Sequence, residues 1–162
     1  MMISYLRTKY STEIDEGLGA LEAGNIHKAE SHFKRVLEHE DDPHMTISDS
    51  IEAHNGMGAA ARAHSDFFDA WRWYKEAEYL LDCQYQNKWP ARLHWSQPHD
   101  RPALRTLIGL GHTAFARDDT KTARKYYKTL IDHDRKDELG IRAMMAALAA
   151  GKHFNHHRHW KK

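Results

Sequence analysis

Residues that bend, break or cross-link a polypeptide are scarce in this 162-residue chain. It has four prolines, nine glycines and one cysteine, Cys83, which cannot form an internal disulfide. Helix-breaking residues are therefore few, and nothing calls for an oxidising compartment. Residues 1–10 lack the apolar core of a signal peptide, and no stretch approaches the roughly 18 apolar residues that cross a bilayer. We therefore expect one all-helical cytoplasmic domain over residues 1–162, without membrane contact.

Motifs that carry catalysis or hold cofactors are missing as well. The sequence has no glycine-rich phosphate loop, no His-Glu-x-x-His, no paired cysteines and no Gly-x-Ser-x-Gly elbow. Acid–histidine neighbours such as Glu38-His39-Glu40 and Asp132-His133-Asp134 fall near expected helix ends, where mixed charge is normally solvated. We predict that the protein is not an enzyme and requires no cofactor.

What the sequence does contain is one spacing that occurs three times. A glycine is followed twelve residues later by an alanine, and four residues beyond that by an aromatic residue. The three copies are Gly17/Ala29/Phe33, Gly58/Ala70/Tyr74 and Gly111/Ala123/Tyr127. The spacing predicts a helix, a tight turn and a second helix in each copy, because polar or glycine-containing triplets lie midway through the gap. These triplets are Ala23-Gly24-Asn25, His64-Ser65-Asp66 and Arg117-Asp118-Asp119.

The residue types at this spacing have a packing explanation. A glycine on one helix and an alanine on the next let the two backbones approach closely. The aromatic residue lies one helical turn beyond the alanine, on the same face, and is expected to fill the space between successive units.

This frame resembles that of the tetratricopeptide repeat family. The resemblance covers units of about 11–40, 51–83 and 104–135, and it implies antiparallel helix pairs stacked as a right-handed α-solenoid. A capping helix is expected over 137–150, closed by Gly151, before a basic, histidine-rich tail over 151–162. The closing segment, with the Arg101-Pro102 pair, also looks like a bacterial subset of the family that has no defined function. The chain departs from the family in its unit spacing of 41 and 53 residues, where about 34 is usual.

The family pattern also indicates where a partner would bind. Stacked helix pairs curve, and the first helix of each unit lines the inner wall. The resemblance implies a mostly apolar groove that accepts a peptide or helical segment of another protein. Its predicted residues are Ile14, Leu18, Leu21, Asn55, Arg62, Ile108, His112 and Phe115. Whether this groove is open or covered by the chain's own loop or tail is left undecided.

Insertions relative to the family lie in the connections between units. Residues 41–50 form a short polar connector, with Ser48 or Asp49 as the expected N-cap of the following helix. The connection over 84–102 is longer and carries Trp89, Arg92 and Trp95. These side chains either pack on the helices beneath them or add to the binding surface, because Trp and Arg dominate interface energies.

Charge is unevenly distributed along the chain. Residues 1–50 hold five Lys/Arg and ten Asp/Glu, whereas residues 101–162 hold fourteen and six. This asymmetry fits an uneven solvated surface, or self-assembly of the acidic end of one copy on the basic end of another. It also suggests nucleic-acid binding by the basic half, a less favoured alternative because acidic residues interleave the cations. The cations concerned are Arg101, Arg105, Lys121, Arg124, Lys125 and Lys128.

The tail offers a weak candidate metal site. His153 and His157 would share one face of a helix, at a spacing that binds zinc, nickel or copper. The tail has no cysteine or carboxylate to complete the site, however, and its lysines and arginine would repel a cation. We therefore predict no physiological metal site there.

Overall fold

A computed structural model describes residues 8–153 of the chain, and all of its regular secondary structure is helical. The prediction of an all-helical fold is thus confirmed for these residues. The elements are α1 (Lys9–Glu22), α2 (Ile26–Leu37), α3 (Ile47–Ala63), α4 (Phe67–Gln84), the 3-10 turn η1 (Pro98–Asp100), α5 (Arg101–Ala116), α6 (Thr120–His133) and α7 (Ile141–Ala149). Among these described residues no helix is long and apolar enough to cross a membrane.

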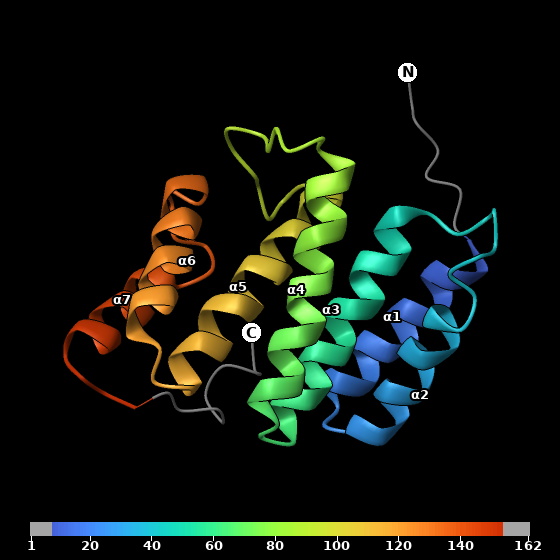
Figure 1. Cartoon of the computed structure of the whole chain (residues 1–162), viewed down its shortest axis with the longest axis horizontal. Coiled ribbons are helices and arrows are strands. Elements are labelled where there is room, and N and C mark those ends of the chain that lie inside the picture. Colours follow the sequence, from blue (N-terminus) through green and yellow to red (C-terminus); the bar gives the residue numbers. More distant parts are fainter. Residues whose placement is uncertain (1–7, 154–162) are drawn as a thin grey trace.

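The helices stand side by side in the order of the chain (Figure 1). Successive helices pack as three antiparallel pairs, α1/α2, α3/α4 and α5/α6, and α7 covers the free side of α6. Contacts also join α1 to α3, and α3 to α5. The first helices of the three pairs therefore share one face of the molecule. Residues 85–97 join α4 to α5 and extend above the upper ends of these helices, near the middle of the row (Figure 1).

The tight turn inside each pair is formed by a residue in the left-handed conformation followed by an N-cap residue. Gly24, Ser65 and Asp118 have φ of 76°, 60° and 59°, the left-handed region. The next residue, Asn25, Asp66 or Asp119, caps the second helix, because its side chain accepts a hydrogen bond from the backbone N–H three residues on. The three predicted turn triplets occupy these turns.

Replacing Ser65 with glycine should stabilise the protein. A side chain in the left-handed region costs about 1–2 kcal/mol, of which the greater freedom of glycine in the unfolded chain offsets about half. We expect a net gain of about 0.5–1 kcal/mol, seen as a melting temperature roughly 1–4 °C higher by circular dichroism. Gly24→Ala is the matched reverse change and should lower the melting temperature, because the conformation at that turn is the same. A lower melting temperature for Ser65→Gly would contradict this account.

Two helix starts differ from the sequence predictions. The N-cap of α3 is Thr46, which forms a reciprocal capping box with Asp49, so the prediction of Ser48 or Asp49 was wrong. The capping helix begins at Ile141 instead of residue 137, because Asp137 and Gly140 both have positive φ and form a turn. Its other end agrees with expectation: Gly151 has a φ of 67° and follows the C-cap.

The three aromatic residues of the repeat are almost fully buried, and each packs against at least one glycine. A Cβ added to Gly17, Gly58 or Gly111 would lie 2.6–2.8 Å from the ring of Phe33, Tyr74 or Tyr127 in the same pair. The rings of Phe33 and Tyr74 also contact a glycine of the next pair. A Cβ on Gly56 would lie 2.3 Å from Phe33, and one on Gly109 would lie 2.1 Å from Tyr74.

Each of these two rings therefore joins successive pairs by filling space left by two missing side chains. Ala29, Ala70 and Ala123, the alanines of the repeat, are completely buried. The sequence pattern identified the glycine that contacts the ring of its own pair, but it missed Gly56 and Gly109, which contact the ring of the preceding pair.

Candidate functional site

A hollow of about 220 Å³ opens on the face shared by α1, α3 and α5. All three first helices line it, with one ring from α4 and one from the long connection. The lining residues are Leu18, Leu21, Glu22, Asn55, Gly56, Ala59, Arg62, Tyr74, Trp95, Arg105, Ile108, Gly109 and His112. A second hollow of about 420 Å³ shares Leu18 and Arg105 with the first and extends toward the N-terminal ends of α1, α3 and α5. We call the two together the groove.

Seven of the eight predicted groove residues line these hollows. Leu18, Leu21, Asn55, Arg62, Ile108 and His112 line the first, and Ile14 lines the second. Phe115 lines neither: it is 3% exposed and packs edge-on against Tyr127, with ring centroids 6.4 Å apart. Phe115 therefore belongs to the core, and its assignment to the groove wall was wrong.

Two of the polar groove residues are used inside the fold. Asn55 Nδ2 donates a hydrogen bond to the carbonyl oxygen of Pro102 at 2.9 Å, and the Thr106 hydroxyl lies 2.8 Å from Asn55 Oδ1. These bonds hold α3 against the first turn of α5. His112 Nδ1 lies 2.7 Å from the Tyr127 hydroxyl, and this contact joins α5 to α6. The floor of the groove is therefore fixed by buried polar contacts between its own helices.

Arg105 of α5 links the two hollows and contacts both α3 and the long connection. Its guanidinium bonds to Glu52 of α3 and lies over the ring of Trp95, 5.3 Å from the centroid. Arg101 also faces that ring and donates from Nε to the Trp95 carbonyl oxygen at 2.9 Å. Burial raises the pKa of Glu52, and the nearby Arg105 opposes this effect. The two arginines thus hold Trp95 at the edge of the groove.

The side chains of the long connection serve different purposes. Trp95 lines the groove, as the binding-surface interpretation requires. Trp89 is attached to the end of α4, because its Nε1 donates to Asp82 Oδ1 at 2.6 Å and its ring packs on Tyr85. Arg92 is exposed and lines a separate hollow beside α6 and α7. The packing interpretation therefore holds for Trp89, whereas Trp95 lies where a binding surface would need it and its part in binding stays a prediction.

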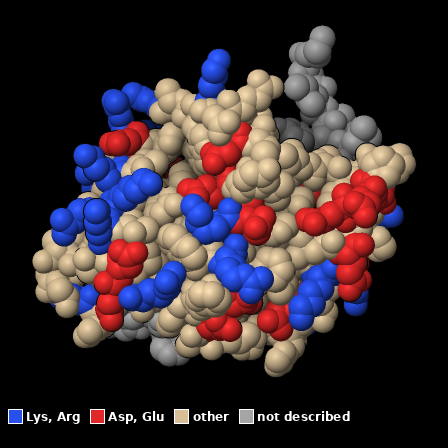
Figure 2. All heavy atoms as spheres, in the orientation of Figure 1, with Lys and Arg blue, Asp and Glu red and all other residues tan. Residues whose placement is uncertain are grey.

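The basic residues suggested for nucleic-acid binding fall into two groups. Arg101 and Arg105 lie in the groove against Trp95. The remaining four are exposed on α6: Lys121, Arg124, Lys125 and Lys128. Figure 2 shows Lys and Arg gathered at the end formed by α6 and α7, and Asp and Glu more frequent toward α1 and α2. The charge asymmetry of the sequence is thus also an asymmetry in space, and self-assembly through it stays a prediction.

The candidate metal pair of the tail is only half within the described residues. His153 is exposed and its Nδ1 lies 3.9 Å from Asp118 Oδ1. His157 lies outside the described residues, so the pair stays untested.

Comparison with models of protein families, with curated proteins and with solved structures gave no match for this chain. The groove, its lining and its contacts are therefore the basis for assigning a function.

Proposed function

We propose that this protein is an interaction module of the tetratricopeptide type. In this proposal three helix pairs, capped by α7, form a right-handed solenoid whose groove binds an apolar or amphipathic segment of another protein. The observation that carries the proposal is the lining of one hollow by α1, α3 and α5 together, with six of the predicted residues in it.

The groove has the chemistry that such a segment needs. Leu18, Ala59 and Ile108 are partly exposed and come from three different helices, so one inserted side chain can contact all three pairs. Trp95 adds an aromatic wall, and large rings at the edge of a hollow contribute strongly to binding. Because the floor is already hydrogen-bonded internally, little ordering is required when a partner binds.

The test replaces two apolar groove residues by charged ones. Peptides that bind the wild-type protein are first selected from a displayed library of random 15-residue sequences. Their affinities are then measured by fluorescence anisotropy for the double variant Leu18→Glu/Ile108→Glu. We expect a loss of about a hundredfold, because each change places a carboxylate against the apolar part of the ligand. Helicity should be unchanged, since both side chains are partly exposed.

The matched control carries the same kind of change outside the groove. Phe68 and Tyr79 of α4 are 69% and 63% exposed, so Phe68→Glu/Tyr79→Glu introduces two carboxylates away from the groove. The control should bind the selected peptides as the wild type does. Equal binding by the groove variant, or failure of the wild type to enrich any peptide, would refute the proposal.

A further inference from the structure

A second kind of site lies where α2 meets the end of α3, outside the groove. His27 and Glu30 lie on the first two turns of α2, and His64 is the C-cap of α3. His27 Nδ1 lies 3.5 Å from Glu30 Oε2, and His64 Nε2 lies 3.5 Å from Glu30 Oε1. One ligand atom from each of the three residues falls within 4.8 Å of the other two.

These separations suit an ion better than they suit hydrogen bonds. A hydrogen bond between an imidazole nitrogen and a carboxylate is usually 2.7–3.2 Å long, so both contacts are too long. Zinc held tetrahedrally at about 2.0–2.1 Å places neighbouring ligand atoms about 3.3–3.4 Å apart. Each imidazole nitrogen lies close to that distance from the Glu30 oxygen that faces it, Oε2 for His27 and Oε1 for His64, so an ion on either oxygen has one imidazole already in place. The His27 side chain is 89% exposed, so its ring can turn to bring the third ligand into place.

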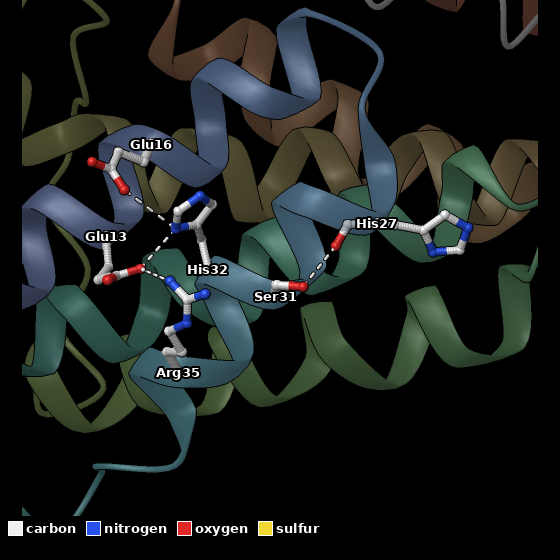
Figure 3. Close-up of polar contacts among 6 residues, drawn as sticks. All are labelled: Glu13, Glu16, His27, Ser31, His32 and Arg35. Carbon is white, nitrogen blue, oxygen red and sulfur yellow. Dashed lines mark hydrogen bonds and ion pairs between the residues drawn. The ribbon is translucent and has the colours of Figure 1, made fainter.

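A neighbouring cluster of two glutamates and one histidine, Glu13, Glu16 and His32, shows the contrast (Figure 3). His32 Nδ1 is directly hydrogen-bonded to Glu13 Oε2 at 2.7 Å, and Arg35 lies 3.4 Å from the same oxygen. The hydrogen bond to His32 and the charge of Arg35 lower the pKa of Glu13. An ion there would have to break that bond beside a fixed cation. In the figure His27 lies at the start of α2 and points away from this cluster, and the Ser31 hydroxyl bonds to its backbone carbonyl at 3.0 Å.

The geometry points to a divalent transition-metal site of the zinc class formed by His27, Glu30 and His64. Two imidazoles and one carboxylate are a ligand set that zinc accepts, with water completing the coordination. Because the ligands come from α2 and α3, a bound ion fastens the first helix pair to the second. Binding therefore raises the stability of the folded protein, by mass action.

The experiment must separate this site from the histidine-rich tail. The starting protein is the full chain with His153, His156, His157 and His159 replaced by asparagine. Zinc chloride is titrated into it by isothermal calorimetry at pH 7.5, and thermal unfolding is followed by circular dichroism with zinc and with EDTA. We expect one bound zinc and a higher unfolding temperature in zinc.

Two further variants in that background remove one ligand each. His64→Asn and Glu30→Gln should each weaken zinc binding at least about tenfold, because loss of an outer-sphere partner alone costs 10–100-fold. Both should also abolish the zinc-dependent rise in unfolding temperature, while their unfolding in EDTA stays close to that of the starting protein. His44→Asn, which changes an exposed histidine in the connector before α3, is the control and should leave zinc binding unchanged.

Several results would overturn the inference. These are the absence of zinc binding by the starting protein, unchanged affinity in both ligand variants, or an equal loss in His44→Asn. None of these results depends on whether the groove binds a peptide.

Discussion

Gly109→Ala is expected to lower the free energy of unfolding by about 2–3 kcal/mol, although it adds a single methyl group. The new Cβ would lie 2.1 Å from the Tyr74 ring, far inside van der Waals contact. Tyr74 is 3% exposed and also presses on Gly58, so its ring has no room to withdraw. The second and third helix pairs would have to separate slightly to accept the methyl group. Urea unfolding followed by circular dichroism measures the change.

Gly19→Ala is the matched control for this substitution. Gly19 is also inside a helix, but nothing lies within 4 Å of a Cβ placed on it. Since alanine is the better helix former, this change should stabilise the protein by about 0.5–1 kcal/mol. Glycine to alanine is thus expected to destabilise the protein at Gly109 and to stabilise it at Gly19. Similar effects at both positions would show that helix propensity, and not the contact with Tyr74, decides the outcome.

A second change tests the contact itself. Tyr74→Leu alone should be destabilising, because it leaves a cavity between Gly58 and Gly109. In the double variant Gly109→Ala/Tyr74→Leu, the alanine methyl group partly fills that cavity. The double variant should therefore lose less stability than the two single variants lose in sum. Additive losses would mean that Gly109 and Tyr74 do not interact.

How far the sequence predicted the fold can be judged from these glycines. The spacing of Gly17, Gly58 and Gly111 to an aromatic residue lies within one helix pair, so it repeats with a constant length. The contact of Gly109 with Tyr74 crosses the long connection between pairs, and the distance along the chain therefore differs from that between Phe33 and Gly56. Contacts inside a pair could be predicted, whereas contacts between pairs were hidden by insertions of unequal length.

The groove illustrates the same limit. Seven of the predicted residues line its hollows because equivalent positions on α1, α3 and α5 come together on one face. Glu52 and Arg105 are such equivalents, each six residues before the glycine of its pair, and aligning the units in this way would have predicted their contact. Phe115 was misplaced because the family pattern cannot tell a wall residue from one that turns toward Tyr127. The contact of Glu30 with His64 joins positions that are not equivalent, so the repeat gave no signal for it.

Arg105→Leu is expected to be the second strongly destabilising change, costing about 3 kcal/mol at pH 7.5. Glu52 has a side chain only 11% exposed, and Arg105 is its charged partner. Removing one member of such a pair costs 3–5 kcal/mol when the other is left buried, and the partial exposure of Arg105 favours the low end of that range. Glu52→Gln should cost less than about 1 kcal/mol, because it removes the buried charge and leaves an arginine that still reaches solvent.

The pH dependence of that loss identifies its cause. Burial raises the pKa of Glu52 above its ordinary value of 4.5 in the folded protein, and without Arg105 the pKa should rise further. A carboxyl group whose pKa is raised in the folded protein lowers the free energy of unfolding at pH values above that raised pKa. This loss of stability disappears as the pH falls toward 4.5, where the unfolded chain also takes up the proton. The stability gap between Arg105→Leu and the wild type, measured by urea unfolding, should therefore narrow from pH 7.5 to pH 5.

The double variant Glu52→Gln/Arg105→Leu separates this effect from the loss of packing on Trp95. This double variant lacks the Glu52 carboxyl group. The difference between its free energy of unfolding and that of Glu52→Gln alone should therefore be small and nearly independent of pH. If Arg105→Leu instead shows the same deficit at both pH values, the arginine stabilises the fold through its stacking on Trp95 and not through Glu52. In that case the ring should also leave the edge of the groove in Arg105→Leu, with a change in tryptophan fluorescence that Glu52→Gln does not share.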